Sequence, residues 1–143
     1  MADPFVLEAL DRESCEALLA NESVGRLAVV VDGQPHIVPV NYVAEGATMV
    51  FRTGSDTILT KASLGKVAFE VDAFHDRRHA GWSVCVYGCG RDITDCVDDE
   101  SRHLRTLFVN CWAPAPRDHW FKVIPESVTG RNSRSVRGAW TQR

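Results

Sequence analysis

Four side chains between positions 52 and 61, namely Arg52, Thr53, Thr60 and Lys61, are of the types that bind phosphate. A phosphate group near neutral pH approaches a dianion, and a guanidinium, an ammonium and two hydroxyl groups satisfy both its charge and its acceptor oxygens. A short helix expected to begin near Ser55 would add backbone N–H donors at its N-terminus. Taken alone, such cations are more often solvated surface charges, so a phosphate site depends on the elements that position them.

The remaining reactive side chains form no recognisable catalytic motif. The sequence has no serine–histidine–aspartate order, no phosphate-loop glycine pattern and no paired catalytic carboxylates. His75 and His79 lack further ligands at metal-site spacing, and the two arginines between them oppose cation binding. We therefore predict no metal site. His36 is an isolated candidate for a general acid or a haem ligand.

The composition is that of an ordinary globular domain without attraction to polyanions. The chain has 143 residues, of which 45% are hydrophobic and 24% charged, and its formal net charge is -3. Binding to nucleic acid or to an anionic membrane requires clustered positive charge. The N-terminus lacks a basic start followed by an apolar core, and no later stretch reaches eighteen apolar residues. We expect a cytoplasmic protein that binds a small molecule and neither nucleic acid nor membrane.

The cysteines indicate free thiols. Their number, five, is odd, and they contain no Cys-x-x-Cys pair. Cys85 and Cys89 on one strand would have Cα atoms about 13 Å apart, too far for a disulfide. We expect free and mostly buried thiols.

The hydrophobic pattern predicts strands with a few short helices. A helix capped by Asp11 precedes two β-rich runs around an Asp32-Gly33 turn, which is a strong hairpin signal. Gly88 and Gly90 indicate a bulge. Helices are expected over 12–20, 54–64 and 98–110, and strands over 25–31, 35–43, 48–53, 66–72 and 81–93. One last strand is expected over 120–124 and 127–131, with Pro125 within it.

Six or so strands with peripheral helices favour a small antiparallel barrel. The runs 24–31 and 66–71 carry apolar residues on both strand faces, so a second subunit is expected to cover the outer one. We predict a single domain over residues 1–131. The basic tail over 132–143 is either disordered or an arm laid on a partner subunit.

Three stretches, 25–43, 51–72 and 81–90, resemble in order the FMN-binding split barrel of pyridoxamine 5′-phosphate oxidase-like proteins. The resemblance extends from about Leu10 to Arg131. It implies a mainly β fold, namely a six-stranded antiparallel split barrel with peripheral helices, that binds FMN as a homodimer.

The resemblance also implies roles for individual residues. The strand 37–42 would lie along the isoalloxazine ring, and Ser83 would contact the ring across the dimer interface. Trp82 adjoins Ser83, although a core or interface role suits this aromatic better. Arg131 could reach the flavin of a partner subunit or cap the final strand. The implied cofactor-binding residues are Val38, Pro39, Val40, Asn41, Arg52, Thr53, Thr60, Lys61, Trp82, Ser83 and Arg131.

The resemblance implies a flavin-dependent oxidoreductase acting on an unidentified small molecule, in which no side chain need be the catalyst. Residues 127–138 lack the arginine- and histidine-containing substrate segment of the vitamin B6 oxidase. The nearer resemblance is to short actinobacterial-type and nitroimidazole-resistance-like members, which use FMN, a deazaflavin or haem. A deazaflavin-dependent reductase and a non-catalytic flavin- or haem-binding module are the alternatives.

Overall fold

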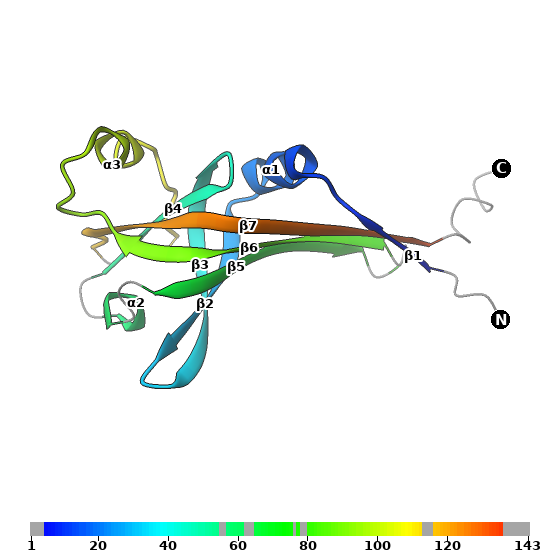
Figure 1. Cartoon of the computed structure of the whole chain (residues 1–143), viewed down its shortest axis with the longest axis horizontal. Coiled ribbons are helices and arrows are strands. Elements are labelled where there is room, and N and C mark those ends of the chain that lie inside the picture. The colour runs from blue at the N-terminus through cyan, green and yellow to red at the C-terminus, as the bar shows by residue number, and fades with distance from the viewer. Residues whose placement is uncertain are drawn as a thin grey trace.

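The strands form one antiparallel sheet that closes on itself (Figure 1). In this computed structural model, which describes residues 5–54, 57–61, 65–75, 77, 80–112 and 116–135, the strand order is β1-β7-β4-β3-β2-β5-β6. Because β6 also pairs with β7, six strands form a ring and β1 adds to its outside. The elements are β1 (Phe5–Ala9), α1 (Arg12–Asn21), β2 (Val24–Val31), β3 (Gln34–Glu45), β4 (Thr48–Thr53), α2 (Ile58–Lys61), β5 (Lys66–His75), β6 (Ala80–Asp92), α3 (Asp99–Leu104) and β7 (His119–Ser135). The predicted mainly β barrel is confirmed.

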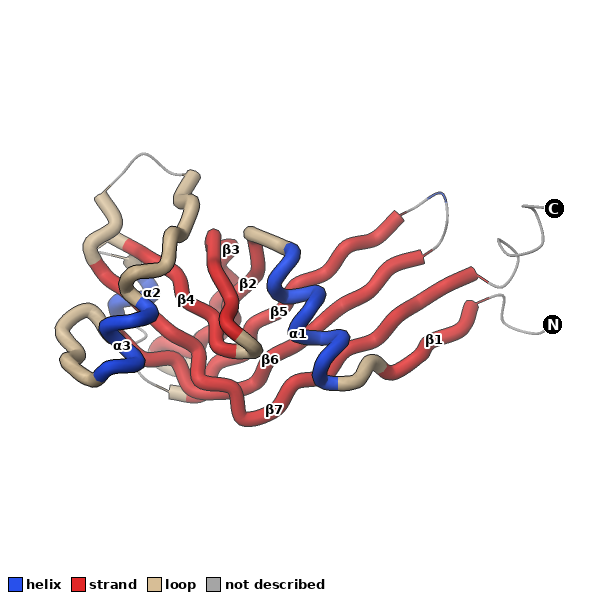
Figure 2. Tube along the Cα trace, turned by 90° about the horizontal axis from the view of Figure 1, so that it is seen from above, coloured by secondary structure: helices blue, strands red, loops and turns tan. Residues whose placement is uncertain are grey.

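Helix α1 forms where the sequence predicts it. The Asp11 carboxylate accepts the N–H of Ser14 at 2.8 Å, and this hydrogen bonding lowers the pKa of Asp11. On its inner face, Cys15 and Leu19 are buried in the main core. Figure 2 shows α1 lying over the sheet, and β5, β6, β7 and β1 extending beyond the ring toward the chain ends.

The hairpin of β2 and β3 turns at Asp32 and Gly33, as predicted. Both residues have positive φ angles, 51° and 77°, the conformation of a two-residue hairpin turn. β3 pairs with β2 up to Asn41 and with β4 only from Tyr42 onward. The barrel is therefore split between β3 and β4 over residues 34–41.

A bulge accommodates the proline of the last strand. The register between β6 and β7 shifts between Tyr87 and Gly88, which faces Pro125. A Cβ at Gly88 would lie 1.9 Å from the Ile124 carbonyl oxygen, so glycine is required there. β7 therefore runs through Pro125 as one strand, as predicted, and continues to Ser135.

Three details differ from the sequence prediction. β1 was not predicted, and it pairs with residues 131–135, so the first residues of the expected tail are strand. α3 ends at Leu104, because the N–H groups of Thr106 and Leu107 bond to carbonyls three residues back and Phe108 turns outward with 82% exposure. Within the predicted helix 54–64, α2 spans Ile58–Lys61, the described residues Gly54 and Thr57 are not helical, and 55–56 and 62–64 lie outside the described residues. The five cysteines are free, but only Cys15 is buried, so the prediction of mostly buried thiols is wrong.

Within the described residues, no helix has the length and apolar character needed to cross a membrane.

Tyr42 connects the core to helix α1. Its side chain is 2% exposed, its ring meets Phe69 edge to face at 4.9 Å, and its hydroxyl donates to the Leu19 carbonyl at 2.6 Å. Burial raises the pKa of Tyr42 far above its ordinary value, so the hydroxyl remains a donor. This bond satisfies a carbonyl near the end of α1.

Tyr42→Phe should lower the free energy of unfolding by about 1–2 kcal/mol, because it leaves the buried Leu19 carbonyl without its donor. Chemical denaturation measures the change. Tyr87→Phe is the matched control, since Tyr87 is 47% exposed, and it should cost less than about 0.5 kcal/mol. Equal effects of the two substitutions would contradict the assigned role of Tyr42.

Gly88→Ala should destabilise the fold by about 2–3 kcal/mol or more, because the added methyl group meets backbone rather than a movable side chain. Gly65→Ala introduces the same group where nothing lies within 4 Å, and it should leave the melting temperature nearly unchanged. A Gly88→Ala protein as stable as the Gly65→Ala protein would show that the bulge adapts.

Candidate functional site

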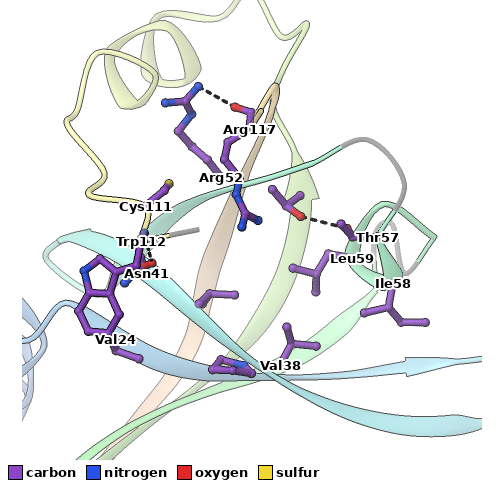
Figure 3. A pocket seen from close by; sticks show the side chains of 13 residues that line it. Val24, Val38, Asn41, Arg52, Thr57, Ile58, Leu59, Cys111, Trp112 and Arg117 are labelled. Atoms are coloured by element: carbon purple, nitrogen blue, oxygen red, sulfur yellow. Dashed lines mark hydrogen bonds between the residues drawn. The ribbon is translucent and has the colours of Figure 1, made fainter. Parts of the chain in front are cut away.

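A cavity of about 350 Å³ lies where β3 and β4 separate, a size typical of small-molecule sites (Figure 3). Its wall combines strand residues, helix α2 and the segment between α3 and β7. The lining residues are Val24, Val38, Pro39, Val40, Asn41, Arg52, Thr53, Thr57, Ile58, Leu59, Cys111, Trp112 and Arg117. We call this the split cavity.

One wall of the split cavity is the open edge of β3. Val38 and Val40 pack on the main core, and Pro39, between them, is exposed. Alternate residues of an antiparallel strand direct their N–H and C=O groups to the same side, so part of the 38–41 backbone faces away from β2. The predicted open side of the strand that carries Pro39 is thus present, and this wall offers apolar surface with a few backbone hydrogen-bonding groups.

Asn41 holds the loop that follows α3 against the cavity. Its side-chain oxygen accepts the backbone N–H of Trp112 at 3.0 Å. The Trp112 side chain is 68% exposed at the rim, with Cys111 beside it on the wall. The resemblance assigns the backbone of Asn41 to the flavin, and the side chain of Asn41 binds the loop.

Two arginines line the split cavity. The Arg52 guanidinium donates through Nη2 to the Arg117 carbonyl at 2.6 Å and lies 4.8 Å above the Trp120 ring. Figure 3 shows Arg52 turned toward that carbonyl, whereas the Arg117 side chain reaches toward the middle of the cavity. The Nε atoms of both arginines are buried without a hydrogen-bond partner in the described structure. Because no carboxylate is among the described lining residues, the wall is suited to an anion.

Threonine hydroxyl groups connect β4 to α2 beside these arginines. Thr53, which is 2% exposed, shares a hydrogen bond with the hydroxyl of Thr57 at 3.0 Å. The Thr60 hydroxyl accepts the Thr57 N–H at 3.2 Å and donates to the Thr57 carbonyl at 2.7 Å, so it closes the turn of α2. Of the predicted phosphate residues, Arg52 and Thr53 thus reach the cavity, Thr60 supports its α2 wall, and the Lys61 side chain lies outside the described residues.

A second cavity, of about 320 Å³, contains two other predicted residues. Ser83 of β6 and Arg131 of β7 lie directly opposite each other on its wall. Trp82 is partly buried against the main core and lines neither of these cavities. The other lining residues are Glu70, Cys85, Tyr87, Thr129 and Gly130. We call this the outer cavity.

Glu70 gives the outer cavity a group that exchanges a proton near neutral pH. Burial, together with hydrogen bonding and charge from Asp72, raises the pKa of Glu70 to about 7. Arg26, whose Nη1 lies 3.2 Å from the carboxylate, opposes this rise only in part.

The two cavities share the outward face of the sheet. Pro39 of the split cavity pairs with Arg26 of β2, and Arg26 pairs with Glu70 of the outer cavity. Residues directly opposite each other on neighbouring strands point to the same face. Arg26 therefore lies in a row between the two cavities.

Sequence reasoning missed several wall residues. Arg117, Cys111 and Trp112 lie in the segment after α3, which was interpreted only as the end of a helix followed by proline stops. This segment has no hydrophobic periodicity that would place its side chains. Its position is set by hydrogen bonds to distant strands, such as the one from Trp112 to Asn41.

Known proteins resemble this chain in both sequence and structure. The family model for pyridoxamine 5′-phosphate oxidase matches residues 11–132. An uncharacterised protein of Mycobacterium tuberculosis is 32% identical over 85% of this chain and 82% of its own length. The structure of an FAD-binding protein from Mycobacterium smegmatis superposes with a TM-score of 0.74 at 31% identity, covering 87% of this chain and 98% of that one. An FAD-binding protein from Mesorhizobium loti gives 0.72 at 25% identity, covering 92% and 99%.

The match of the family model covers the whole barrel, including both cavities and the strands that form the split. Its extent agrees with the stretch from about Leu10 to Arg131 in which the sequence resembles these proteins. The chain belongs to the pyridoxamine 5′-phosphate oxidase family.

Proposed function

We propose that the protein binds a flavin nucleotide in the split cavity and is a flavin-dependent oxidoreductase that acts on a small molecule. The observation that carries this proposal is the pairing of an apolar, open-edged strand with buried, unpartnered guanidinium nitrogens. A flat isoalloxazine ring matches the first feature and a phosphate matches the second. When bound, the flavin supplies hydride or electron transfer, and the chain binds and orients it.

The chain would hold the two ends of the flavin with different elements. Val38, Pro39 and Val40 would contact the ring, with their backbone groups along its polar edge. Arg52 and Thr53, with Thr60 and Lys61 at the end of α2, are the phosphate-binding residues that the sequence predicts. The observed wall brings Val38, Pro39, Val40, Arg52 and Thr53 to one cavity, which supports this placement.

The phosphate site is common to FMN and FAD, since both contain riboflavin 5′-phosphate. FMN is the cofactor implied by the sequence resemblance, whereas two structural relatives are described as FAD-binding. We propose FMN as the smallest ligand that uses both the apolar wall and the arginines. FAD is the second candidate, favoured by those relatives.

Purified protein should bind FMN after reconstitution and show the blue absorbance of a flavin, and titration should give tighter binding for FMN than for riboflavin, which lacks the phosphate. A parallel titration with FAD compares the two nucleotides. Reduction of the bound flavin by NADH or NADPH distinguishes an oxidoreductase from a non-catalytic module. A protein that binds none of the three flavins, or one that shows a haem Soret band instead, would overturn the proposal.

We also propose that the protein is a homodimer joined through the outward face of the sheet. An apolar row crosses four strands there, because Ile37 pairs with Ala28, Ala28 with Ala68, and Ala68 with Tyr87. Ile37 is 74% exposed and Tyr87 is 47% exposed. A second copy of the chain on this face would bury the row and bring the outer cavity, with Ser83 and Arg131, toward the split cavity of its partner.

Light scattering should give about twice the chain mass of 15.9 kDa. Ile37→Asp places a charge in the apolar row and should shift the protein toward the monomer, with a weaker affinity for FMN. Val97→Asp is the matched control, because Val97 is 71% exposed and lies outside the sheet, and it should remain dimeric. A monomeric wild-type protein that binds FMN tightly would contradict the shared site.

A further inference from the structure

Arg117 differs from the other arginines whose partners are defined. Arg12, Arg26 and Arg134 pair with carboxylates at the surface, and Arg105 donates to the Ile93 carbonyl. The Nε atoms of Arg117 and Arg52 are both buried without a partner, but Arg52 donates through Nη2, whereas the Arg117 side chain makes no hydrogen bond within the described structure. A buried donor on a cation is costly unless something satisfies it, so this group is placed for an anionic ligand.

The surroundings of Arg117 define the chemistry of that ligand. The described wall contains apolar side chains, an amide, a thiol and two hydroxyl groups, but no carboxylate that could neutralise the guanidinium. In an apolar cavity, the attraction between a guanidinium and an anion is stronger than in water. A guanidinium with its planar set of donors matches the oxygens of a phosphate.

Arg52 is held in a different way. Its Nη2 donates to the Arg117 carbonyl at 2.6 Å, and its guanidinium stacks on Trp120 at 4.8 Å. The first contact ties Arg52 to the segment that carries Arg117, and the second ties it to the start of β7, which follows that segment. The side chain that reaches into the cavity in Figure 3 is that of Arg117.

We infer that Arg117 binds the phosphate of the flavin nucleotide directly and that Arg52 is a positioning residue, which fixes the backbone from which Arg117 projects. The identity of the flavin rests on the proposed function, whereas the assignment of Arg117 as an anion-binding residue rests on the cavity itself. This assignment makes Arg117, rather than Arg52, the main phosphate-binding arginine. The sequence points to Arg52 and gives no signal for Arg117.

The test is titration of the apo-protein with FMN and with riboflavin for wild type, Arg117→Ala, Arg117→Lys, Arg52→Ala and the Arg52→Ala/Arg117→Ala double variant. Arg117→Ala should weaken FMN binding about ten- to a hundredfold and riboflavin binding less than about twofold. Arg117→Lys should recover part of the loss, since it restores the charge without the planar donors. The Arg117 carbonyl remains in each variant, so its bond with Arg52 is preserved wherever Arg52 is present.

A double-mutant cycle separates the two roles. If Arg52 acts through Arg117, Arg52→Ala weakens FMN binding in the wild-type background and has almost no further effect once Arg117 is alanine. Arg91→Ala is the control for removal of one positive charge, because Arg91 is exposed on β6 and does not line the split cavity, and it should leave both affinities unchanged. Additive losses in the double variant would overturn the positioning role of Arg52. Equal losses of FMN and riboflavin binding in Arg117→Ala would overturn the phosphate role of Arg117.

A melting experiment with inorganic phosphate in place of flavin tests the anion site independently of the proposed function. Inorganic phosphate should raise the melting temperature of wild type and Arg91→Ala more than that of Arg117→Ala. If no flavin binds but this difference is present, the proposed function fails and the anion site remains. If phosphate stabilises wild type and Arg117→Ala equally, the anion site is overturned even where flavin binds.

Discussion

The site depends on one constraint, which is that β3 exchanges strand partners at Tyr42. From this residue onward β3 pairs with β4, whereas residues 34–41 pair only with β2. Tyr42 is fixed by its contacts with Phe69 and with the Leu19 carbonyl, so the point of separation is anchored in the core. The core thereby stabilises an open strand edge, which a regular barrel would close by hydrogen bonding. The split cavity is the space beside that edge.

The segment after α3 completes the cavity because its backbone is bound at two points of the split. The Trp112 N–H donates to Asn41 on β3, and the Arg117 carbonyl accepts from Arg52 on β4. Two polar side chains of the separated strands therefore bind loop backbone instead of each other. One of the two guanidinium groups on the wall, that of Arg117, therefore comes from neither strand, whereas that of Arg52 comes from β4. The loop bound in this way adds a second arginine to the cavity.

Sequence patterns predicted the elements whose signals are local. The Asp32-Gly33 turn, the Asp11 cap and the bulge at Gly88 each follow from the conformations or hydrogen bonds that these residue types favour. β1 could not be found in this way, since it exists through its pairing with residues 131–135 at the far end of the chain. The residues of the site likewise fall into those that the sequence indicated and those that only distant contacts position. The resemblance to the family implied that Val38–Asn41 and Arg52–Thr53 belong to one site, and they line one cavity, but Arg117 lies in a segment without periodicity that is positioned by tertiary hydrogen bonds.

The outward face combines features that oppose stability in an isolated chain. Ile37 exposes apolar surface to water, and Glu70 has a pKa of about 7 because burial and Asp72 outweigh the attraction of Arg26. A carboxyl group with a raised pKa keeps its proton in the folded state after the unfolded chain has released it. Its contribution to stability therefore falls as pH rises from its ordinary value of 4.5 toward 7. Perturbed carboxyl groups of this kind occur both at functional sites and in ion-pair networks, and Glu70 pairs with Arg26 at 3.2 Å. Glu70, in line with Arg26 and Pro39, thus connects the outer cavity to the split cavity through one row of side chains across β2.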